Sequence, residues 1–524
     1  MVKVSAIVPV FNPGGNIDEC IGSLVGQSLP KDEYELIFVD DGSTDGTEAR
    51  LDELAAEHPN VRVEHIPNSG WPGRPRNVGL ELARGEFVVF VDNDDYLGTE
   101  ALERLYARAI EDDADIVLGK VVGRGKFVPW RLFTENRSDV TLEWPQLLSL
   151  LTPHRLFRRA LLDEHGIRFP EGKRRLEDHH FTMHAYFHAR HVSILADYPC
   201  YYWVQRSGGR TTSYQGFDPV PYYENLREVL DLVVEHTEPG PLRDRLLAHW
   251  YRGKMLGRAG GTWFRNRTPE VRRAFYDEIV ALTHERYGPE VDEWLPPNLQ
   301  VRSFVLRDRT FDALAALASW EAELRADVTI GDAREEDDGT FVVPFEGRIV
   351  DMEGRPLLFS QTGGRTLWLP PAELSEELPE SALDMTEALE NASAQVLIRA
   401  RDDDAEFVIR TEYEYALEPA EKGVVTPVAL GKARLTEAPR AGRWNVLGTL
   451  TVCGFSAIAR ARSRTTAAEY VIDVDATGSV TPHSPIGPSA VVGKLARTMP
   501  GVAGAFRRVR ARRRARARAR AAAA

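Results

Sequence analysis

Cysteine is scarce in this chain, and long apolar runs are absent. Only three cysteines occur among 524 residues, Cys20, Cys200 and Cys453, far apart and odd in number. That pattern excludes a disulfide framework and fits a reducing compartment. No apolar run approaches the roughly 18 residues that a membrane-spanning helix requires, and the segment 2–11 is typical of a strand rather than of a signal peptide. We therefore expect a cytoplasmic protein.

Acidic residues outnumber basic residues over most of the chain. The formal net charge is -14 at pH 7, which argues against a general nucleic-acid binder. The exception is the segment 494–520, which has 11 basic and no acidic residues, so the rest of the chain carries -25. Arginine clusters beside a weakly amphipathic stretch suit an anionic membrane surface. We predict that the basic tail, 481–524, attaches the protein peripherally to the inner face of the cell membrane. A disordered, solvated arm is the alternative.

Within a first domain that we predict over 1–216, residues 1 to about 120 alternate between strand-like and helix-like patterns. The runs 4–10, 35–39 and 86–91 are almost continuously β-branched and aromatic, as buried parallel strands require. Amphipathic stretches lie between them. This alternation predicts an α/β fold with a doubly wound, Rossmann-like sheet, whose ligand binds at the carboxyl ends of the strands.

Two further regions and the tail follow this domain. The pattern is helical over 217–325 and changes after residue 326 to short alternating runs separated by glycine, proline and aspartate turns. These runs predict a β-sandwich, or two small ones, over 326–480. Its role is either oligomerisation or polymer binding.

Carboxylates cluster after two of the predicted strands. Asp40-Asp41-Gly42-Ser43 offers hydrogen-bond acceptors for a base or a ribose, although a turn with a helix cap would also explain it. Asp92-Asn93-Asp94-Asp95 offers hard oxygen ligands for Mg²⁺ or Mn²⁺ on a diphosphate, although acidic loops after strands are common.

Two arginines that could bind phosphate lie between these two acidic segments. The segment 68–79 reads as a loop rigidified by Pro72, Gly73 and Pro75 that presents Arg74 and Arg76 to phosphate, or else as a solvated basic loop.

Glu177-Asp178 precedes a helical segment and offers a general base. The spacing of His180, His184 and His188 on the same helix resembles a transition-metal site. The interleaved aromatic residues favour core packing instead.

In combination and in order, these pieces resemble the inverting family 2 glycosyltransferases of the GT-A fold. The matching segments are Ile7 to Asn12, Val39 to Asp45, Arg76-Asn77-x-Gly79, Val91 to Asp95 and Leu176 to Asp178. The resemblance implies transfer of a sugar from a nucleotide-diphospho-sugar by direct displacement, with Mn²⁺ or Mg²⁺ on the departing diphosphate.

The resemblance also implies residue roles. Asp178 would be the general base with Glu177 beside it, and Asp94 with Asp92 would form the metal site. Arg206 and Arg210, in a glycine-containing loop that could close as a lid, would hold the diphosphate. The donor would be bound by Pro9, Phe11, Asn12, Asp41, Asn68, Arg76, Asp92 and Asn93.

The overall plan resembles the wall teichoic acid N-acetylglucosaminyltransferases of Gram-positive bacteria. That resemblance implies a UDP-linked N-acetylglucosamine donor, a polymeric or lipid-linked polyol-phosphate acceptor, and C-terminal immunoglobulin-like domains that form a homotrimer. Two other readings stay open. A nucleotidyltransferase of the same fold would need basic residues after the first strand, which the segment 11–16 lacks. An inactive carbohydrate-binding scaffold should have lost a carboxylate, but Asp41, Asp92, Asp94 and Asp178 are all present.

Overall fold

The structure is a computed structural model that describes residues 1–124, 126, 128–205, 218–337, 341–375, 378–401, 406–435, 441–475 and 480–483. It contains two compact units, one of Met1–Ala259 with Asn266–Leu295 and one of Gly260–Arg265 with the chain from Pro296 onward. Arg206, Arg210 and the basic tail beyond His483 lie outside the described residues.

The N-terminal unit is built on an eight-stranded sheet with the order β3-β2-β1-β4-β7-β6-β8-β5. Strands β1 to β4 run parallel, and β7 lies antiparallel between β4 and β6. Every residue of β1, β2 and β4 is buried, which explains their continuous apolar sequences. The strands are β1 (Val4–Val10), β2 (Tyr34–Asp40), β3 (Val61–His65), β4 (Phe87–Phe90), β5 (Tyr96–Leu97), β6 (Ile116–Arg124), β7 (Leu156–Arg158) and β8 (Val192–Val204).

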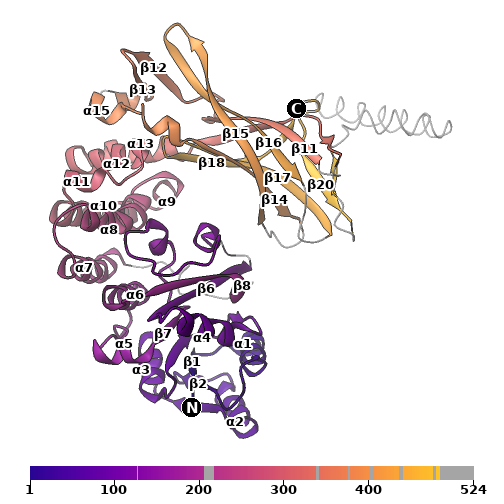
Figure 1. Ribbon diagram of the computed structural model, residues 1–524. Helices are drawn as coiled ribbons and strands as arrows, with labels where there is room; N and C mark the ends of the chain where they lie inside the picture. Colours follow the sequence, from indigo (N-terminus) through magenta and orange to yellow (C-terminus); the bar gives the residue numbers. More distant parts are fainter. Residues whose placement is uncertain are drawn as a thin grey trace, which may run out of the picture. The chain divides into compact units, whose positions relative to one another are not determined.

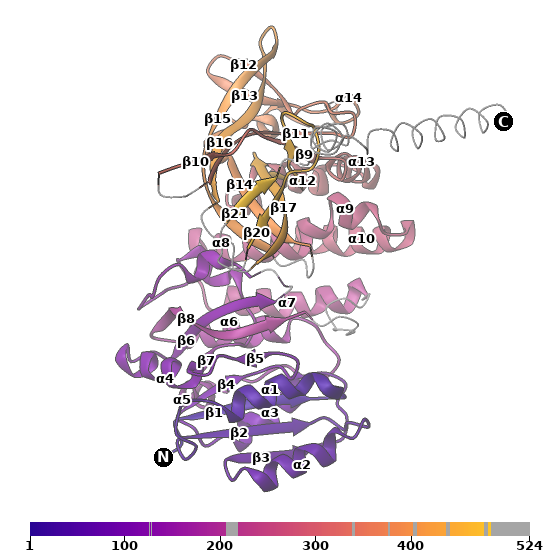
Figure 2. The same ribbon diagram turned by 90° about the vertical axis from the view of Figure 1, so that its right-hand side faces the viewer.

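Helices pack against this sheet (Figure 1, Figure 2). α2 contacts β3, α3 contacts β1 and β2, and α4 contacts β6 and β8. At Gly79 of α3 a Cβ atom would lie 2.3 Å from the Ile7 side chain, so glycine permits the close approach to β1. The helices are α1 (Ile17–Val25), α2 (Thr47–Glu57), α3 (Gly73–Leu82), α4 (Ala101–Glu111), α5 (Arg159–Glu164) and α6 (Glu177–His188).

One local prediction was wrong. The segment 68–79 does not form a loop throughout, because α3 begins at Gly73 and carries Arg74 and Arg76 in its first turns. Pro75 is compatible with this, since the first turn of a helix has no intrahelical partners for its N–H groups.

The helical stretch predicted over 217–325 is present, and its helices are shared between the two units. Several begin at a proline, which suits the first helical position. The N-terminal unit holds α7 (Pro219–Glu235), α8 (Pro241–Trp250), a π-helical turn (Tyr251–Met255), α10 (Pro269–Arg286) and α11 (Pro289–Asp292). The other unit holds α9 (Gly261–Arg265), α12 (Pro297–Asp308) and α13 (Phe311–Glu321).

The strand-rich character predicted for 326–480 is confirmed. Its strands follow the path β19-β9-β11-β16-β15-β14-β17-β20-β21, with β10, β12, β13 and β18 paired at its sides. Trp368 and Trp444 are buried in this unit. The strands are β9 (Arg325–Ile330), β10 (Arg334–Glu335), β11 (Phe341–Val350), β12 (Leu358–Thr362), β13 (Arg365–Leu369), β14 (Ser393–Ala400), β15 (Glu406–Glu421), β16 (Val424–Leu435), β17 (Gly442–Val452), β18 (Phe455–Arg460), β19 (Arg462–Ser463), β20 (Val471–Val474) and β21 (Val480–His483), with short helices α14 (Ala372–Ser375) and α15 (Glu380–Leu383).

Across the described residues, no helix has the length and apolar character needed to cross a membrane. Cys20, Cys200 and Cys453 are buried and form no disulfide, as expected of a chain without a disulfide framework.

Candidate active site

Asp92 lies at the centre of the candidate site, two residues beyond the end of β4. Arg76 donates from Nη2 to Asp92 Oδ1 at 2.8 Å, and His154 donates from Nε2 to Asp92 Oδ2 at 3.0 Å. Burial opposes ionisation of Asp92, but the charges of Arg76 and His154 outweigh it and hold the pKa of Asp92 well below its usual range. Asp92 is therefore ionised, and a hydrogen bond orients each of its two carboxylate oxygens.

Arg76 joins this carboxylate to a second one. Its Nη1 atom lies 3.5 Å from Glu177 Oε1, and its guanidinium lies over the Phe169 ring at 5.2 Å from the centroid. Arg76 is only 5% exposed. A buried guanidinium between two acidic groups favours the ionised form of both carboxyl groups and orients them.

Glu177 and Asp178 form the first turn of α6. The helix starts after Leu176, a non-glycine residue held at φ 65, which costs backbone energy and is typical of functional sites. Burial and the neighbouring Asp178 charge raise the pKa of Glu177 to about 7, against the opposing effect of Arg76. Burial also raises the pKa of Asp178, while Lys254 and Arg76 oppose that shift. A carboxylate with a raised pKa is a better proton acceptor.

Lys254 completes this side of the site and was not found from the sequence. It comes from the π-helical turn, and burial together with Arg258 lowers the pKa of its ammonium to about 8 while Asp178 opposes the shift. Nearby, Trp250 donates from Nε1 to His179 Nδ1 at 3.2 Å and so ties α8 to α6. No motif marks Lys254, because only the packing of the helical region against α6 brings it near Asp178.

Asp41 and Asn68 lie together at the end of β2. The Asp41 carboxylate accepts hydrogen bonds from the Ser69 backbone N–H at 2.8 Å and from Ser69 Oγ at 2.9 Å, and Asn68 Nδ2 donates to the Asp41 carbonyl at 2.8 Å. Gly42, at φ 74, allows the close approach, since a Cβ there would lie 2.9 Å from the Asn68 nitrogen. In this structure Asp41 thus shapes the 68–70 loop.

The end of β1 is shaped by two asparagines. Asn12 Oδ1 accepts from the Thr44 N–H at 2.7 Å, and Asn93 Nδ2 donates to the Pro9 carbonyl at 3.1 Å. Phe11, next to Asn12 in the chain, is 49% exposed. The predicted donor-binding residues around β1, β2 and β4 therefore share one edge of the sheet.

Asp94 and Asp95 differ in their surroundings. Burial and the charge of Asp92 raise the pKa of Asp94. Asp95 is fully buried, accepts hydrogen bonds from Tyr201 Oη at 2.7 Å and from the Val204 N–H at 2.8 Å, and has its pKa raised to about 7, mainly by burial.

Asp92, Asp95 and His154 have possible ligand atoms within 4.8 Å of one another, a group that includes Asp95 rather than the predicted Asp94. His154 donates to Asp92 and Asp95 accepts from Tyr201, so we assign His154 to positioning Asp92 and Asp95 to positioning Tyr201.

The loop that carries His154 was also missed from the sequence. His154 stacks on Tyr201 with ring centroids 4.1 Å apart. The next residue, Arg155, is 1% exposed and donates to the Leu150 and Thr152 carbonyls at 2.7 and 2.6 Å. A lone histidine outside any periodic element gives no sequence signal of such a role.

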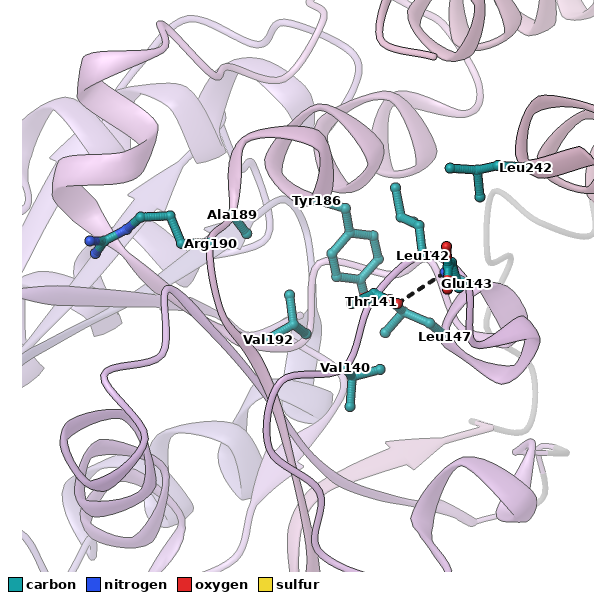
Figure 3. Close-up of a pocket in the computed structure, with 10 residues that line it drawn as sticks. All are labelled: Val140, Thr141, Leu142, Glu143, Leu147, Tyr186, Ala189, Arg190, Val192 and Leu242. Atoms are coloured by element: carbon teal, nitrogen blue, oxygen red, sulfur yellow. Dashed lines mark hydrogen bonds between the residues drawn. The ribbon is translucent and has the colours of Figure 1, made fainter. Parts of the chain in front are cut away.

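Figure 3 shows a cavity in the N-terminal unit. Its volume is about 390 Å³, and its lining contains none of the predicted site residues. Glu143 and Arg190 are its charged members, and Tyr186 of α6 forms part of its wall. We do not assign it to the candidate site.

Comparison with known proteins identifies the family. The model of glycosyl transferase family 2 matches residues 5–197. The poly(ribitol-phosphate) beta-N-acetylglucosaminyltransferase TarP of Staphylococcus aureus is 31% identical over 270 residues, which span 48% of this chain and 80% of that protein. The chain belongs to glycosyltransferase family 2. A model described as the TarS linker domain matches residues 219–318 of this family 2 glycosyltransferase, which adopts the GT-A fold followed by a helical linker region.

Two further relatives extend the match. The poly(ribitol-phosphate) beta-glucosyltransferase of Bacillus spizizenii is 33% identical over 332 residues, 63% of this glycosyltransferase and 52% of that protein. The chain thus spans about half the length of this curated relative. The crystal structure of S. aureus TarS 1-349 in complex with UDP-GlcNAc is 29% identical with a TM-score of 0.56, covering 68% of this chain and 98% of that one.

Proposed function

We propose that this glycosyltransferase moves N-acetylglucosamine from UDP-N-acetylglucosamine to a hydroxyl of poly(ribitol phosphate), with inversion at the anomeric carbon. The relatives named for poly(ribitol phosphate) and the solved UDP-GlcNAc complex support this choice of substrates. The observation that carries the proposal is the chain of charges Asp92–Arg76–Glu177, with Asp178 beside it. It joins the strand end where a donor would bind to the helix start where an acceptor would be deprotonated.

The chain's own residues account for each part of the displacement. Asp178 takes the proton of the acceptor hydroxyl while that oxygen forms a bond to the anomeric carbon. The bond from that carbon to the UDP oxygen breaks, and its electron pair leaves with UDP. Glu177 and Arg76 hold Asp178 in a buried, charged environment in which its raised pKa favours proton transfer.

The acidic segment after β4 suits a divalent cation, which the family commonly uses. Burial and the Asp92 charge disfavour ionised Asp94, so a cation beside it would relieve both effects. We propose that Asp94, with Asp92, holds Mn²⁺ or Mg²⁺. When bound, the ion would neutralise the diphosphate of the donor.

The helical region supports an anionic acceptor. Lys254 is half-buried, and burial with the repulsion from Arg258 lowers the pKa of its ammonium, while the charge of Asp178 opposes the shift. Arg252, two residues earlier in the same π-helical turn, is an exposed second cation. A phosphate of the acceptor polymer would stabilise the charges of both side chains.

Glucose is the second candidate for the transferred sugar. The observation in its favour is that the Bacillus relative, named as a glucosyltransferase, matches 63% of this chain. The two donors differ at the sugar C2 substituent.

The deciding experiment measures UDP release from UDP-N-acetylglucosamine and from UDP-glucose, each with and without poly(ribitol phosphate), in Mn²⁺, Mg²⁺ or EDTA. Polymer-dependent release from the N-acetylglucosamine donor supports the proposal, and faster release from UDP-glucose favours the second candidate. If UDP binds but neither donor is turned over with polymer, another acceptor must be sought. If UDP does not bind at all, the inactive scaffold is the better description.

Three further features extend the proposal to the whole chain. We propose that the strand-rich region folds as immunoglobulin-like sandwiches and forms a homotrimer, and that the basic tail, 481–524, binds anionic membrane. Light scattering of the full chain tests the trimer, since a monomeric mass would contradict it. Co-sedimentation with vesicles containing phosphatidylglycerol, compared with phosphatidylcholine vesicles, tests the tail.

A further inference from the structure

A cluster of histidines lies at the far end of α6 from the candidate base. His184 and His188 project from the last two turns of α6, and His236 caps the C-terminus of α7. The two helices pack side by side within the N-terminal unit (Figure 1, Figure 2). All three rings are partly exposed, so an ion in solution can reach them.

The three imidazoles converge on one point. Their ring centroids are 5.1 Å apart for His184 and His188, 5.1 Å for His188 and His236, and 6.0 Å for His184 and His236. One nitrogen of each ring lies within 4.8 Å of a nitrogen of the other two. Three nitrogens bound to one Zn²⁺ at about 2.0–2.1 Å lie about 3.4 Å apart in a tetrahedron. Small rotations of the side chains would therefore bring them into ligand geometry.

The surroundings prepare these rings to act as ligands. His236 Nδ1 lies 2.9 Å from the Leu232 carbonyl oxygen, which can only accept, so Nδ1 carries the proton and Nε2 keeps its lone pair. Phe187 stacks on the His236 ring at 4.9 Å and fixes its plane.

The rings of α6 are neutral and lie next to a carboxylate. Burial and the neighbouring histidines lower the pKa of His184 to about 4. Among the described residues, no hydrogen bond is found to the His184 or His188 ring. The negative charge of Glu235 favours positive charge at both rings.

We propose that His184, His188 and His236 form a binding site for a divalent transition-metal ion of the zinc class, separate from the Asp92 and Asp94 region. Imidazole nitrogens suit Zn²⁺, Cu²⁺, Ni²⁺ and Co²⁺, whereas Mg²⁺ and Mn²⁺ prefer oxygen. Three protein ligands leave a fourth position for water. The ion would clamp the end of α6 to the end of α7, and thus brace the helix whose first turn carries Glu177 and Asp178.

The residues involved differ from the trio suggested by sequence spacing. His180 shares a face of α6 with the other two, but its ring packs against His184 at 6.2 Å, and the third ligand comes from α7 instead. Only the contact between the helices reveals His236.

The test uses the full chain without a polyhistidine tag, stripped with chelator and then saturated with Mg²⁺ and UDP to occupy the donor site. Calorimetric titration with Zn²⁺ should show one tight site per chain. His184→Gln and His236→Gln should each weaken Zn²⁺ binding at least tenfold. His165→Gln is the matched control, because His165 stacks on His188 at 4.0 Å but is not in the ligand group. It should change the affinity less than twofold.

Two results would overturn the site. The first is no Zn²⁺ binding by the Mg²⁺- and UDP-loaded wild type. The second is an equal loss of affinity in the control and in the ligand variants. UDP affinity, measured for every variant, reports folding of the unit. Should a variant fail to fold, the Co²⁺-loaded wild type still decides. Intense visible bands of a low-coordinate nitrogen site support the proposal, and only weak bands of an octahedral oxygen site refute it.

Discussion

Replacing Glu177 by glutamine should stabilise the N-terminal unit above pH 7 while impairing catalysis. The Glu177 side chain is 11% exposed, and burial with the Asp178 charge raises its pKa from an ordinary 4.5 to about 7. A carboxyl whose pKa is raised by folding binds its proton more tightly in the folded chain. Its contribution to stability is therefore present below the unfolded pKa and is lost as the pH rises from 4.5 through about 7.

The magnitude follows from that difference. The interval between 4.5 and about 7 corresponds to about 3 kcal/mol of unfolding free energy at pH 8. Glutamine keeps the shape of the protonated side chain and cannot ionise. The variant should thus exceed the wild type by about 3 kcal/mol at pH 8 and by less than about 1 kcal/mol at pH 4.5.

The assay must report the N-terminal unit separately from the strand-rich one. Denaturant-dependent hydrogen exchange of the buried β1 and β4 amides does so, at pH values between 4.5 and 8. Glu53→Gln, on the exposed face of α2, is the control for loss of a carboxylate and should leave stability within about 0.5 kcal/mol at every pH. A gain that is the same at pH 4.5 and pH 8, or a loss at pH 8, would refute the reasoning.

Three other variants test individual roles. Asp178→Asn should lower kcat by about 10²-fold or more because the base is lost, and UDP affinity from calorimetry should stay within threefold; near-normal turnover would sink the assignment. Asp94→Asn should weaken UDP binding in Mn²⁺ and leave it unchanged in EDTA, and equal affinities for wild type and variant in Mn²⁺ would remove Asp94 from the cation site. Lys254→Met should raise the KM for poly(ribitol phosphate) with little change in the KM for the donor. An increase confined to the donor KM would place Lys254 on the other substrate.

The sheet and its acidic edge were predictable because they depend on local pattern. Buried parallel strands need continuous apolar sequence, and β1 was predicted with the bounds it has, Val4–Val10. The carboxyl ends of such strands meet at one edge, so Asp41 and Asp92 were expected to be neighbours of the same ligand. The helical region and the strand-rich region also followed from their periodicity.

Contacts between segments far apart in the chain could not be predicted from that local pattern. His154 reaches Asp92 across 62 positions, and the charge of Lys254 acts on Asp178 from a π-helical turn that no residue type specifies. The start of α3 at Gly73, rather than a loop, also needed the packing of that helix against β1 and β2.

The sequence by itself determined the order of elements, the position of the carboxylates at strand ends and the presence of an acidic pair at a helix start, since each depends on neighbours within a few residues. Only the tertiary structure decided which charges face one another. Arg76 between Asp92 and Glu177, and His236 beside His184 and His188, result from how helices pack on a sheet and on each other. That packing is settled by burial of whole apolar faces, to which the polar side chains contribute little.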